Sequence, residues 1–351
     1  MKPTVSRRMF ICSGAGSVAA VVTGTPSDRL RVGVIGLGRR GGLHVWGFAR
    51  TPSVDVCTLC DVKPGSLDRF VALVSQRRAR PPQRYADYRA LLDRKDVDAV
   101  GIALPERLRS AAVHDALQAG KHVLLDPNGL LGLREGRALE QEARRYGCLI
   151  DVSQTYAALD TSLASGGFRG GDFISMDGRL LVSGDPRSVL AQSFGGLDLA
   201  RRGLECRLPS SVAAFELPGV SLAMAFRFPD KGRIASLDWE VRRQTSKAGT
   251  PAGALLSISA QGAAGPNFAE WHMPEESDIS FRPSRERFHA FAKAVRMRDP
   301  GLLLTPIAEA RLTSALLRLG SIAAKLGRPL SFNPLRECLV GEDAAEERKL
   351  G

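Results

Sequence analysis

A glycine-rich turn between a short apolar strand and an amphipathic segment most constrains what this chain can fold into. The strand is predicted at Arg31 to Ile35, and it leads directly into Gly36, Gly38 and Gly41, spaced as GxGxxG. The first glycine permits a tight turn, the second lets backbone approach a pyrophosphate, and the third lets helix and strand pack closely. The predicted helix at Leu43 to Ala49 directs its N-terminus at the same anion. The pattern indicates the start of a dinucleotide-binding fold.

An acidic residue after the second predicted strand strengthens this interpretation. The strand runs from Val54 to Cys60, and Asp61 follows it, twenty residues past Gly41. A carboxylate there can accept hydrogen bonds from the adenosine ribose and repels the 2′-phosphate of NADP. NAD is therefore expected, with NADP as the alternative because Lys63 and Arg40 can partly neutralise Asp61; a plain glycine turn is the competing explanation. The residues predicted to bind the cofactor are Gly36, Gly38, Arg39, Arg40, Gly41, Asp61, Leu104 and Pro105.

The remainder of residues 29–150 alternates strands and helices, as a doubly wound α/β domain with a parallel sheet does. Right-handed crossovers would place a cofactor at the carboxyl ends of the strands. Helices are predicted at 87–94, 110–119 and 133–146, and strands at 99–104, 122–125 and 149–153.

Residues 151–351 carry a different pattern. Period-two and short apolar runs, separated by glycine, proline and aspartate, predict sheet strands. Two helices follow, at Arg285 to Met297 and at Ile307 to Leu326, the second ended by Gly327. They are expected to pack back as closing elements of an α+β domain. The strands are predicted at 173–182, 212–215, 220–228, 233–241 and 254–259, and loops at 246–253 and 262–267.

The first 28 residues resemble a bacterial export signal. Arg7 and Arg8 lie in Ser-Arg-Arg-x-Phe-Ile, and a weakly hydrophobic stretch of small residues continues to about Gly24. The pattern is more similar to a twin-arginine signal than to a general secretory one and predicts a periplasmic or extracytoplasmic location. Because that route exports folded proteins, a cofactor acquired before export is expected. A frayed N-terminal helix and an uncleaved anchor are the alternatives.

Composition excludes several protein classes. With 44% hydrophobic and 25% charged residues, the chain is neither disordered nor collagen-like. No run of about 18 apolar residues follows the leader, so no membrane span is expected in the mature chain. The formal charge is +12, but the basic residues are scattered and not interleaved with aromatics, so no nucleic-acid partner is expected. The cysteines show no framework spacing, and neither a disulfide scaffold nor a metal site is predicted.

Motifs spread over most of the mature chain point to one family. They lie at 34–44, 60–62, 85–89, 96–105, 119–123, 287–291 and 322–330. As a set they resemble the glucose-fructose oxidoreductase, inositol dehydrogenase and rhizopine catabolism family (Gfo/Idh/MocA), in its twin-arginine-exported branch. The resemblance implies a Rossmann domain followed by a domain with a large, mainly antiparallel open sheet. It also implies NAD(P) bound between them and a sugar or cyclitol substrate.

The positions that the resemblance makes catalytic are altered. The family's lysine, in Glu-Lys-Pro after the strand at 122–125, corresponds to Pro127 in this chain. The family's histidine, at a helix start, corresponds to Gly195, and only the aspartate of that motif is kept, as Asp198. Oxidation of a secondary alcohol needs a base within hydrogen-bond reach of the hydroxyl. Catalysis is therefore expected to be altered or lost.

Four residues can substitute as a base. Asp198 and Asp126 are the candidate catalytic residues, and Tyr156 and His114 are further possibilities. Asp126 is also explained as a turn cap, and His114 as a surface residue of its helix. Guanidinium groups replace the family's imidazoles at Arg107 and Arg109, which stay protonated and can hold only an anionic substrate.

Two functions are consistent with these residues. One is an NAD(P)-dependent oxidoreductase acting on a sugar or polyol, including a redox-neutral route of glycoside cleavage. The other is a non-catalytic cofactor- or sugar-binding protein of the same fold. A sugar-like small molecule is the expected ligand. A homo-oligomer is expected as well, because alternation along 220–228 places Met224, Phe226 and Phe228 on one sheet face and small residues on the other.

Overall fold

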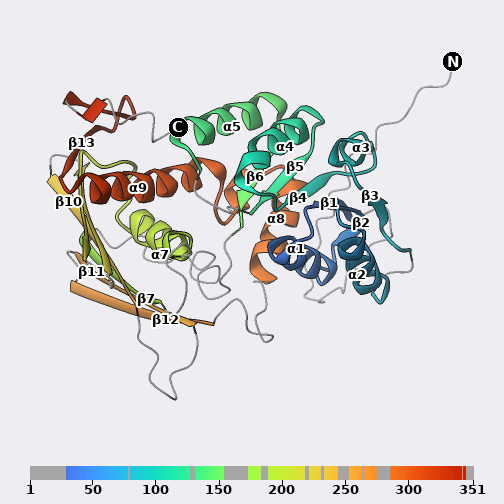
Figure 1. The fold of residues 1–351 in the computed structure, drawn as a ribbon, viewed down its shortest axis with the longest axis horizontal. Helices are drawn as coiled ribbons and strands as arrows, with labels where there is room; N and C mark the ends of the chain where they lie inside the picture. The colour runs from blue at the N-terminus through green and yellow to red at the C-terminus, as the bar shows by residue number, and fades with distance from the viewer. Residues whose placement is uncertain are drawn as a thin grey trace, which may run out of the picture.

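Two sheets with their helices form the described part of the chain (Figure 1). The computed structural model describes residues 29–77, 80–126, 131–153, 173–182, 189–217, 221–230, 233–243, 253–262, 265–274, 285–341 and 343–344. The two sheets lie at opposite ends of the molecule, and α5 (Leu133–Tyr146) and α9 (Ile307–Leu326) lie side by side between them. The N-terminal half is thus a Rossmann domain, and the second half an α+β domain, as predicted.

The first sheet is parallel and six-stranded, in the order β3-β2-β1-β4-β5-β6. Apart from the polar, exposed edge strand β3, its strands are mostly apolar and buried, which is typical of a parallel sheet covered by helices. The order reverses between β1 and β4, and ligands of such folds bind at that switch point. The strands are β1 (Leu30–Ile35), β2 (Val54–Cys60), β3 (Gln83–Tyr85), β4 (Ala99–Ile102), β5 (His122–Leu125) and β6 (Ile150–Val152). The helices that accompany α5 are α1 (Arg39–Ala49), α2 (Pro64–Ser75), α3 (Tyr88–Leu92) and α4 (Glu106–Gln118).

The second sheet has eight strands in the order β12-β11-β7-β10-β9-β8-β13-β14. β7 and β10 pair in parallel and the other pairs are antiparallel, so the sheet is mainly antiparallel, as expected. The strands are β7 (Phe173–Val182), β8 (Ser211–Leu217), β9 (Ser221–Asp230), β10 (Arg233–Arg243), β11 (Gly253–Gly262), β12 (Gly265–Pro274), β13 (Leu330–Asn333) and β14 (Cys338–Leu339).

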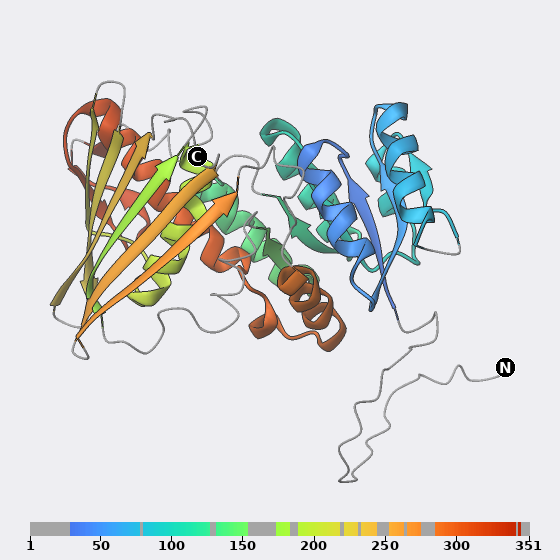
Figure 2. The same ribbon diagram turned by 90° about the horizontal axis from the view of Figure 1, so that it is seen from below.

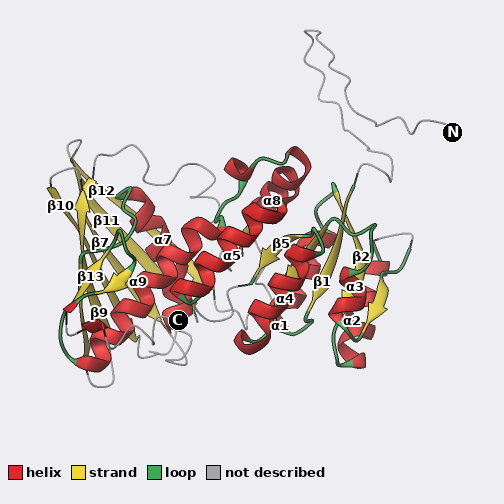
Figure 3. Ribbon diagram, turned by 90° about the horizontal axis from the view of Figure 1, so that it is seen from above, coloured by secondary structure: helices red, strands yellow, loops and turns green. Residues whose placement is uncertain are grey.

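One face of this sheet is covered by α7 (Val189–Gly203) and α9 (Figures 2 and 3). Trp239 of β10 is buried against α7, and a Cβ added at Gly196 of α7 would lie 2.6 Å from its ring. Only glycine permits this close approach of helix and sheet. Met224, Phe226 and Phe228 are buried on the same face, as the alternation predicts.

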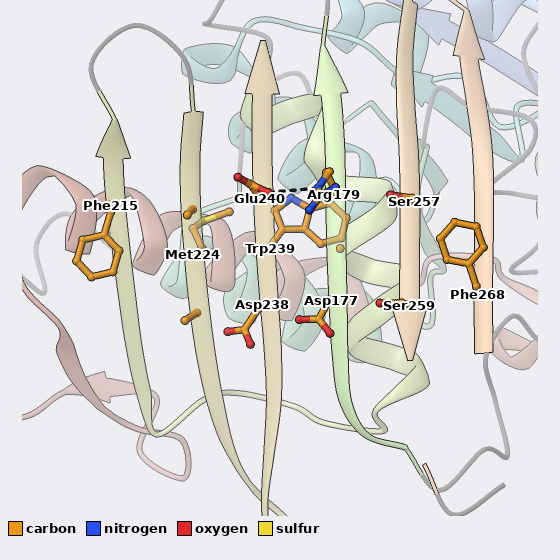
Figure 4. A pocket seen from close by; sticks show the side chains of 13 residues that line it. Asp177, Arg179, Phe215, Met224, Asp238, Trp239, Glu240, Ser257, Ser259 and Phe268 are labelled. Carbon is orange, nitrogen blue, oxygen red and sulfur yellow. Dashed lines mark hydrogen bonds and ion pairs between the residues drawn. The ribbon is translucent and has the colours of Figure 1, made fainter. Parts of the chain in front are cut away.

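None of the described helices covers the other face. A shallow hollow of about 410 Å³ runs across it, with Phe215 and Phe268 at its two sides (Figure 4). These two side chains are 58% and 64% exposed. Between them lie Asp177, Asp238, the ion pair of Arg179 with Glu240 at 3.2 Å, and small residues. Arg227 pairs with Asp238 at 3.0 Å. This is the open sheet face.

The C-terminal helix α8 (Arg285–Met297) returns to the Rossmann domain. Its Phe288 ring packs edge-on against Phe48 of α1, with the centroids 4.8 Å apart. Beside it, Arg287 is buried and donates to Asp151 Oδ2 at 2.8 Å. Strand β6 ends at Val152, and α8 packs against α1 of the Rossmann domain.

Several local expectations differ from the structure. Gly195 was expected at a helix start, but α7 begins at Val189, so Gly195 lies in mid-helix. Strand β12 begins at Gly265, inside a predicted loop, because pairing with β11 satisfies its backbone groups. The helices at 133–146, 285–297 and 307–326 have the predicted bounds. No helix in the described ranges is both long and apolar enough to cross a membrane.

Candidate cofactor-binding site

The glycine turn has the shape that its sequence predicts. Gly36 adopts φ +82°, a left-handed conformation that favours glycine, and a Cβ there would lie 2.4 Å from the Ala103 carbonyl oxygen. A Cβ on Gly41 would lie 1.7 Å from the Gly36 oxygen. At Gly38, by contrast, an added Cβ meets nothing within 4 Å. Two glycines are therefore required by the fold, and the space beside Gly38 is open to a ligand.

Helix α1 begins at this open position. Gly38 is its N-cap and makes no side-chain cap hydrogen bond. The first turn carries Arg39 and Arg40 and no acidic residue. The helix N-terminus and both guanidinium groups favour a negatively charged group at Gly38.

Asp61 connects the end of β2 to the glycine turn. Its Oδ2 accepts a hydrogen bond from the Leu37 amide at 2.6 Å, and its Oδ1 accepts one from the Lys63 amide at 2.8 Å. A carboxylate offers about four acceptor positions, so two amides leave capacity for ribose hydroxyls. Asp61 thus both holds the turn and faces the site, and the first of these roles was not predicted.

Arg40 and Asp126 meet across the same edge of the sheet. Arg40 Nη1 lies 3.9 Å from Asp126 Oδ2. Asp126 follows β5, is only 3% exposed, and its amide donates to the Ile102 oxygen at 2.8 Å. Leu104 lies against Gly36, and Pro105 is the N-cap of α4. The predicted residues from β1, β2, β4 and β5 therefore gather at the carboxyl edge.

Asp198 has a different environment. It is fully buried in α7, where its Oδ1 accepts from the Thr313 hydroxyl at 2.6 Å. Arg201 and Arg202 each approach the carboxylate to 3.2 Å. Burial alone would raise the pKa of Asp198, but the two guanidinium groups and the Thr313 hydroxyl lower it. The geometry is that of an ion cluster joining α7 to α9.

Arg109 and His114 also make contacts within the fold. Arg109 is fully buried, and its Nη2 lies 3.1 Å from both carboxylate oxygens of Glu135. It therefore cannot hold an anionic substrate, although Arg107 is exposed. His114 lies at the surface of α4, with Nδ1 2.8 Å from Glu142, as expected of a surface helix residue. Tyr156 and Pro127 lie outside the described residues.

The described residues also form no metal-binding cluster. Over the described ranges, no three His, Cys, Asp or Glu residues are placed to hold a metal ion. Arg40 and Asp126 were both predicted as site residues, but not as a pair. The only available signal was that each lies near the carboxyl end of a strand.

Residues 30–154 match the family model Gfo/Idh/MocA, described as an oxidoreductase family with an NAD-binding Rossmann fold. The Rossmann domain belongs to the Gfo/Idh/MocA family. Its residues fit the dinucleotide, because the two sterically required glycines shape the turn and Gly38 leaves room beside it. The domain is thus an NAD-binding domain, which confirms the predicted cofactor class.

Proteins similar to this Gfo/Idh/MocA domain include glycoside hydrolases. A glycosyl hydrolase family 109 protein of Shewanella pealeana is 32% identical over 103 residues, covering 28% of this chain and 23% of the relative. An alpha-N-acetylgalactosaminidase of Shewanella oneidensis is 35% identical over 101 residues, covering 28% of this chain and 22% of the relative. The matched region spans about a quarter of each relative's length.

Solved structures are similar over most of this chain. A probable dehydrogenase from Thermotoga maritima has a TM-score of 0.69 at 17% identity, covering 88% of this chain and 100% of that one. A scyllo-inositol dehydrogenase from Lactobacillus casei, with bound NAD(H) and scyllo-inositol, has a TM-score of 0.63 at 15% identity, covering 86% and 99%. At these identities the likeness shows that both domains share the fold of such proteins.

Proposed function

We propose that this protein binds NAD(H) at the glycine turn and acts on a sugar or polyol, with chemistry altered from that of its family. The observation that carries the proposal is the combination of an open position at Gly38 with Asp61 at the end of β2. The first suits a pyrophosphate and the second a ribose. Sugar and cyclitol names among similar proteins support the substrate class.

Each residue at the edge has a proposed task. Gly38 lets the backbone approach the pyrophosphate, and Arg39 and Arg40 add positive charge there. Asp61 accepts hydrogen bonds from the ribose. When bound, NAD supplies a hydride acceptor at its nicotinamide ring. Asp126, which lies at the carboxyl end of β5 beside Arg40, is the proposed proton acceptor for a substrate hydroxyl.

NAD is proposed in preference to NADP. Arg40 faces Asp126 at β5, and β5 lies three strands from β2 in the sheet. That separation is roughly 14 Å at about 4.8 Å per strand. Lys63 contacts Asp61 through its backbone amide. The carboxylate of Asp61 thus lies where it would repel a 2′-phosphate.

We propose a structural task for Asp198. Asp198 is fully buried, and its carboxylate is held by two guanidinium groups and by the Thr313 hydroxyl. This leaves Asp126 as the surviving candidate base of the two predicted carboxylates. With Asp126 as the one candidate base, in place of the family's lysine and histidine, we expect the catalysis to be altered.

The competing candidate is a non-catalytic NAD- or sugar-binding protein of the same fold. It is favoured by Arg109, which was predicted as a substrate contact but which forms an ion pair with Glu135.

Export through a twin-arginine-type signal to the periplasm is proposed on the sequence of residues 1–28.

We also propose that the open sheet face mediates self-association. Phe215 and Phe268 are large apolar side chains exposed on a surface whose other residues are mostly small or paired (Figure 4). A second copy related by two-fold symmetry would cover both phenylalanines of each subunit.

The test of the main proposal separates binding from turnover. The purified full chain is denatured, and the supernatant is searched for nicotinamide dinucleotide by absorbance and mass spectrometry. Turnover is then measured as NAD reduction with cyclitols and as release of p-nitrophenol from an N-acetyl-α-galactosaminide without net NADH. Released or titratable NAD with either activity supports the proposal. NAD binding with sugar binding but no turnover supports the non-catalytic candidate, and no NAD binding refutes both.

A further inference from the structure

Helix α8 presents a row of basic side chains to solvent. Arg285, His289, Lys293 and Arg296 are all exposed, and their spacing of three or four residues places them on one side of the helix. The helix carries one acidic residue, Glu286, in its first turn. Its other side is buried against the Rossmann domain through Phe288 and the residues around it. Figure 2 shows the helix at the lower border of that domain, away from the carboxyl edge.

Three shallow hollows extend this row on both sides. Arg285 lines one of about 380 Å³ together with Arg77 and Arg50. Lys293 and Arg296 line a second, of about 550 Å³. Arg296 also lines a third, of about 540 Å³, so the second and third hollows adjoin at this residue. We call this surface the basic face and define it by six exposed residues: Arg29, Arg77, Arg285, Lys293, Arg296 and Arg298.

Acidic groups are sparse along it. Of the residues that line the three hollows in the described chain, Asp98 is the acidic one. Its Oδ2 already accepts a hydrogen bond from the Arg31 amide at 2.8 Å. The basic face therefore has a strong excess of positive charge, which sequence analysis read as scattered.

The third hollow is not built to bind a single small anion. The Lys121 ammonium is buried and donates to the Arg94 and Val97 carbonyl oxygens at 2.6 and 2.8 Å. Burial and the charge of Arg298 lower the pKa of His122. Helices α4 and α8 both end here, with their partially negative C-termini. The positive charge thus comes from exposed side chains spread over a wide area, which suits an extended anionic surface.

Two further features favour a lipid surface as the partner. Met297 is 62% exposed at the end of the row, beside Lys293 and Arg296. Arg29 lines the third hollow, so the leader is attached to the chain at the basic face. The leader contains Lys2, Arg7 and Arg8 followed by an apolar stretch to about residue 24. Stable membrane binding commonly needs two signals, an apolar anchor and a basic patch. The apolar stretch of the leader and the basic face match these two signals.

We propose that the basic face binds the anionic surface of a phospholipid bilayer, and that this holds the domain against the membrane. The proposal is independent of NAD binding, because the basic face lies at the opposite edge of the sheet from Gly38. Juxtamembrane lysine and arginine residues each strengthen binding to anionic lipid by about fivefold at moderate salt, and the effect weakens as salt rises.

The experiment is sedimentation of the full chain with vesicles of phosphatidylglycerol and phosphatidylcholine, or of phosphatidylcholine alone. We expect binding to the anionic vesicles only, weakened at high salt. The double variant Lys293→Glu/Arg296→Glu should bind at least about tenfold more weakly, from the loss of two favourable charges. The control Arg107→Glu/Arg336→Glu makes the same charge change at exposed positions outside the basic face and should bind within about threefold of the parent, because distant charges are screened. Since all variants keep residues 1–28, the difference reports on the face alone.

Circular dichroism checks that each variant is folded. Should the first variant unfold, Arg77→Glu/Arg285→Glu tests the other end of the same face. The proposal is overturned if the parent binds neither vesicle, if it binds phosphatidylcholine equally well, or if the Lys293/Arg296 variant binds like the control. It is also overturned if duplex DNA displaces the parent from vesicles and binds with the same variant sensitivity, because the face is then a nucleic-acid surface.

Discussion

Arg40 Nη1 and Asp126 Oδ2 lie 3.9 Å apart, across the edge of the Rossmann sheet where β1 and β5 end. The arginine comes from the first turn of α1, and the carboxylate follows β5, so the pair bridges the switch point between β1 and β4. We propose that this buried carboxylate, held beside the cofactor edge, takes a proton from a bound hydroxyl. This relationship is the reason that Asp126 carries the proposed chemistry.

Replacing Asp126 by asparagine should therefore remove the proton acceptor with little change in shape. We expect turnover on a sugar or polyol to fall by about a hundred- to ten-thousand-fold, which is the usual contribution of general base catalysis. The dissociation constant for NAD should change by less than about threefold, since the main cofactor contacts are proposed at Gly38 and Asp61. Steady-state kinetics and calorimetry measure the two quantities. Turnover equal to that of the parent would remove Asp126 from the mechanism.

Asp198→Asn should affect stability instead. The substitution keeps the acceptor for the Thr313 hydroxyl but removes the buried negative charge beside Arg201 and Arg202, which leaves the partly exposed Glu309 as their remaining carboxylate partner among the ion pairs of this cluster. Breaking a buried ion cluster in this way typically costs roughly 3–5 kcal/mol of unfolding free energy. Denaturant unfolding measures the loss. A folded, stable Asp198→Asn protein with no turnover would return Asp198 to the list of catalytic candidates.

The two glycines of the turn should respond oppositely to substitution. Gly38→Val places its side chain in open space, so we expect stability within about 1 kcal/mol of the parent. NAD binding should be lost, because the side chain occupies the path of the pyrophosphate. Gly41→Ala places a Cβ 1.7 Å from the Gly36 oxygen, so the backbone must shift and stability should fall by roughly 1–3 kcal/mol. Equal NAD affinity in Gly38→Val and parent, measured by calorimetry, would refute the site.

The parts of the fold predicted from sequence are those determined locally. Helix α9 has its predicted bounds because Pro306 can begin a helix and Gly327, at φ +63°, can end one. The glycine turn and Asp61 are likewise encoded within about thirty consecutive residues, as is usual for this motif.

The parts that were not predicted depend on distant contacts. Helix α7 contains Gly195 and Gly196, which weaken a helix in isolation. The packing of Gly196 against Trp239 helps to stabilise this helix in the folded protein. From the sequence, Asp198 is predicted to be catalytic, because its hydrogen bond from Thr313, 115 positions away, is known only from the structure. In the same way, Arg109 reads as a substrate contact until its partner on α5 is known.

Self-association through the open sheet face gives a further prediction. Phe215→Asp/Phe268→Asp should convert an oligomer to a monomer, because two desolvated charges would be trapped at the interface. Sedimentation velocity over a range of concentrations measures the mass. Leu335→Asp is the matched control, since Leu335 is 94% exposed and does not line the hollow. A parent that sediments as a monomer at every concentration would disprove the interface.

His44 of α1 should make the protein less stable in mild acid. It is buried against Phe48 and Phe288, and neither ring nitrogen has a hydrogen-bond partner among the described residues. Burial, aided by the charges of Arg40 and Arg287, lowers the pKa of His44 from 6.5 to about 3. Below pH 6.5 the unfolded chain binds a proton that the folded chain does not, so stability is lost as the pH falls from 6.5 towards 3. At pH 5 the loss from this group is roughly 2 kcal/mol, at 1.36 kcal/mol per pKa unit.

The substitution His44→Leu tests this directly, because it keeps an apolar side chain of similar size but removes the titrating ring. Urea unfolding at pH 5 and pH 8 gives the difference in unfolding free energy between the two conditions. We expect that difference to shrink by roughly 2 kcal/mol in the variant. His114→Gln, at the exposed contact with Glu142, is the control and should leave the difference close to that of the parent. If His44→Leu and the parent lose equal stability between pH 8 and pH 5, His44 is protonated in the folded state, and its ring must have a partner.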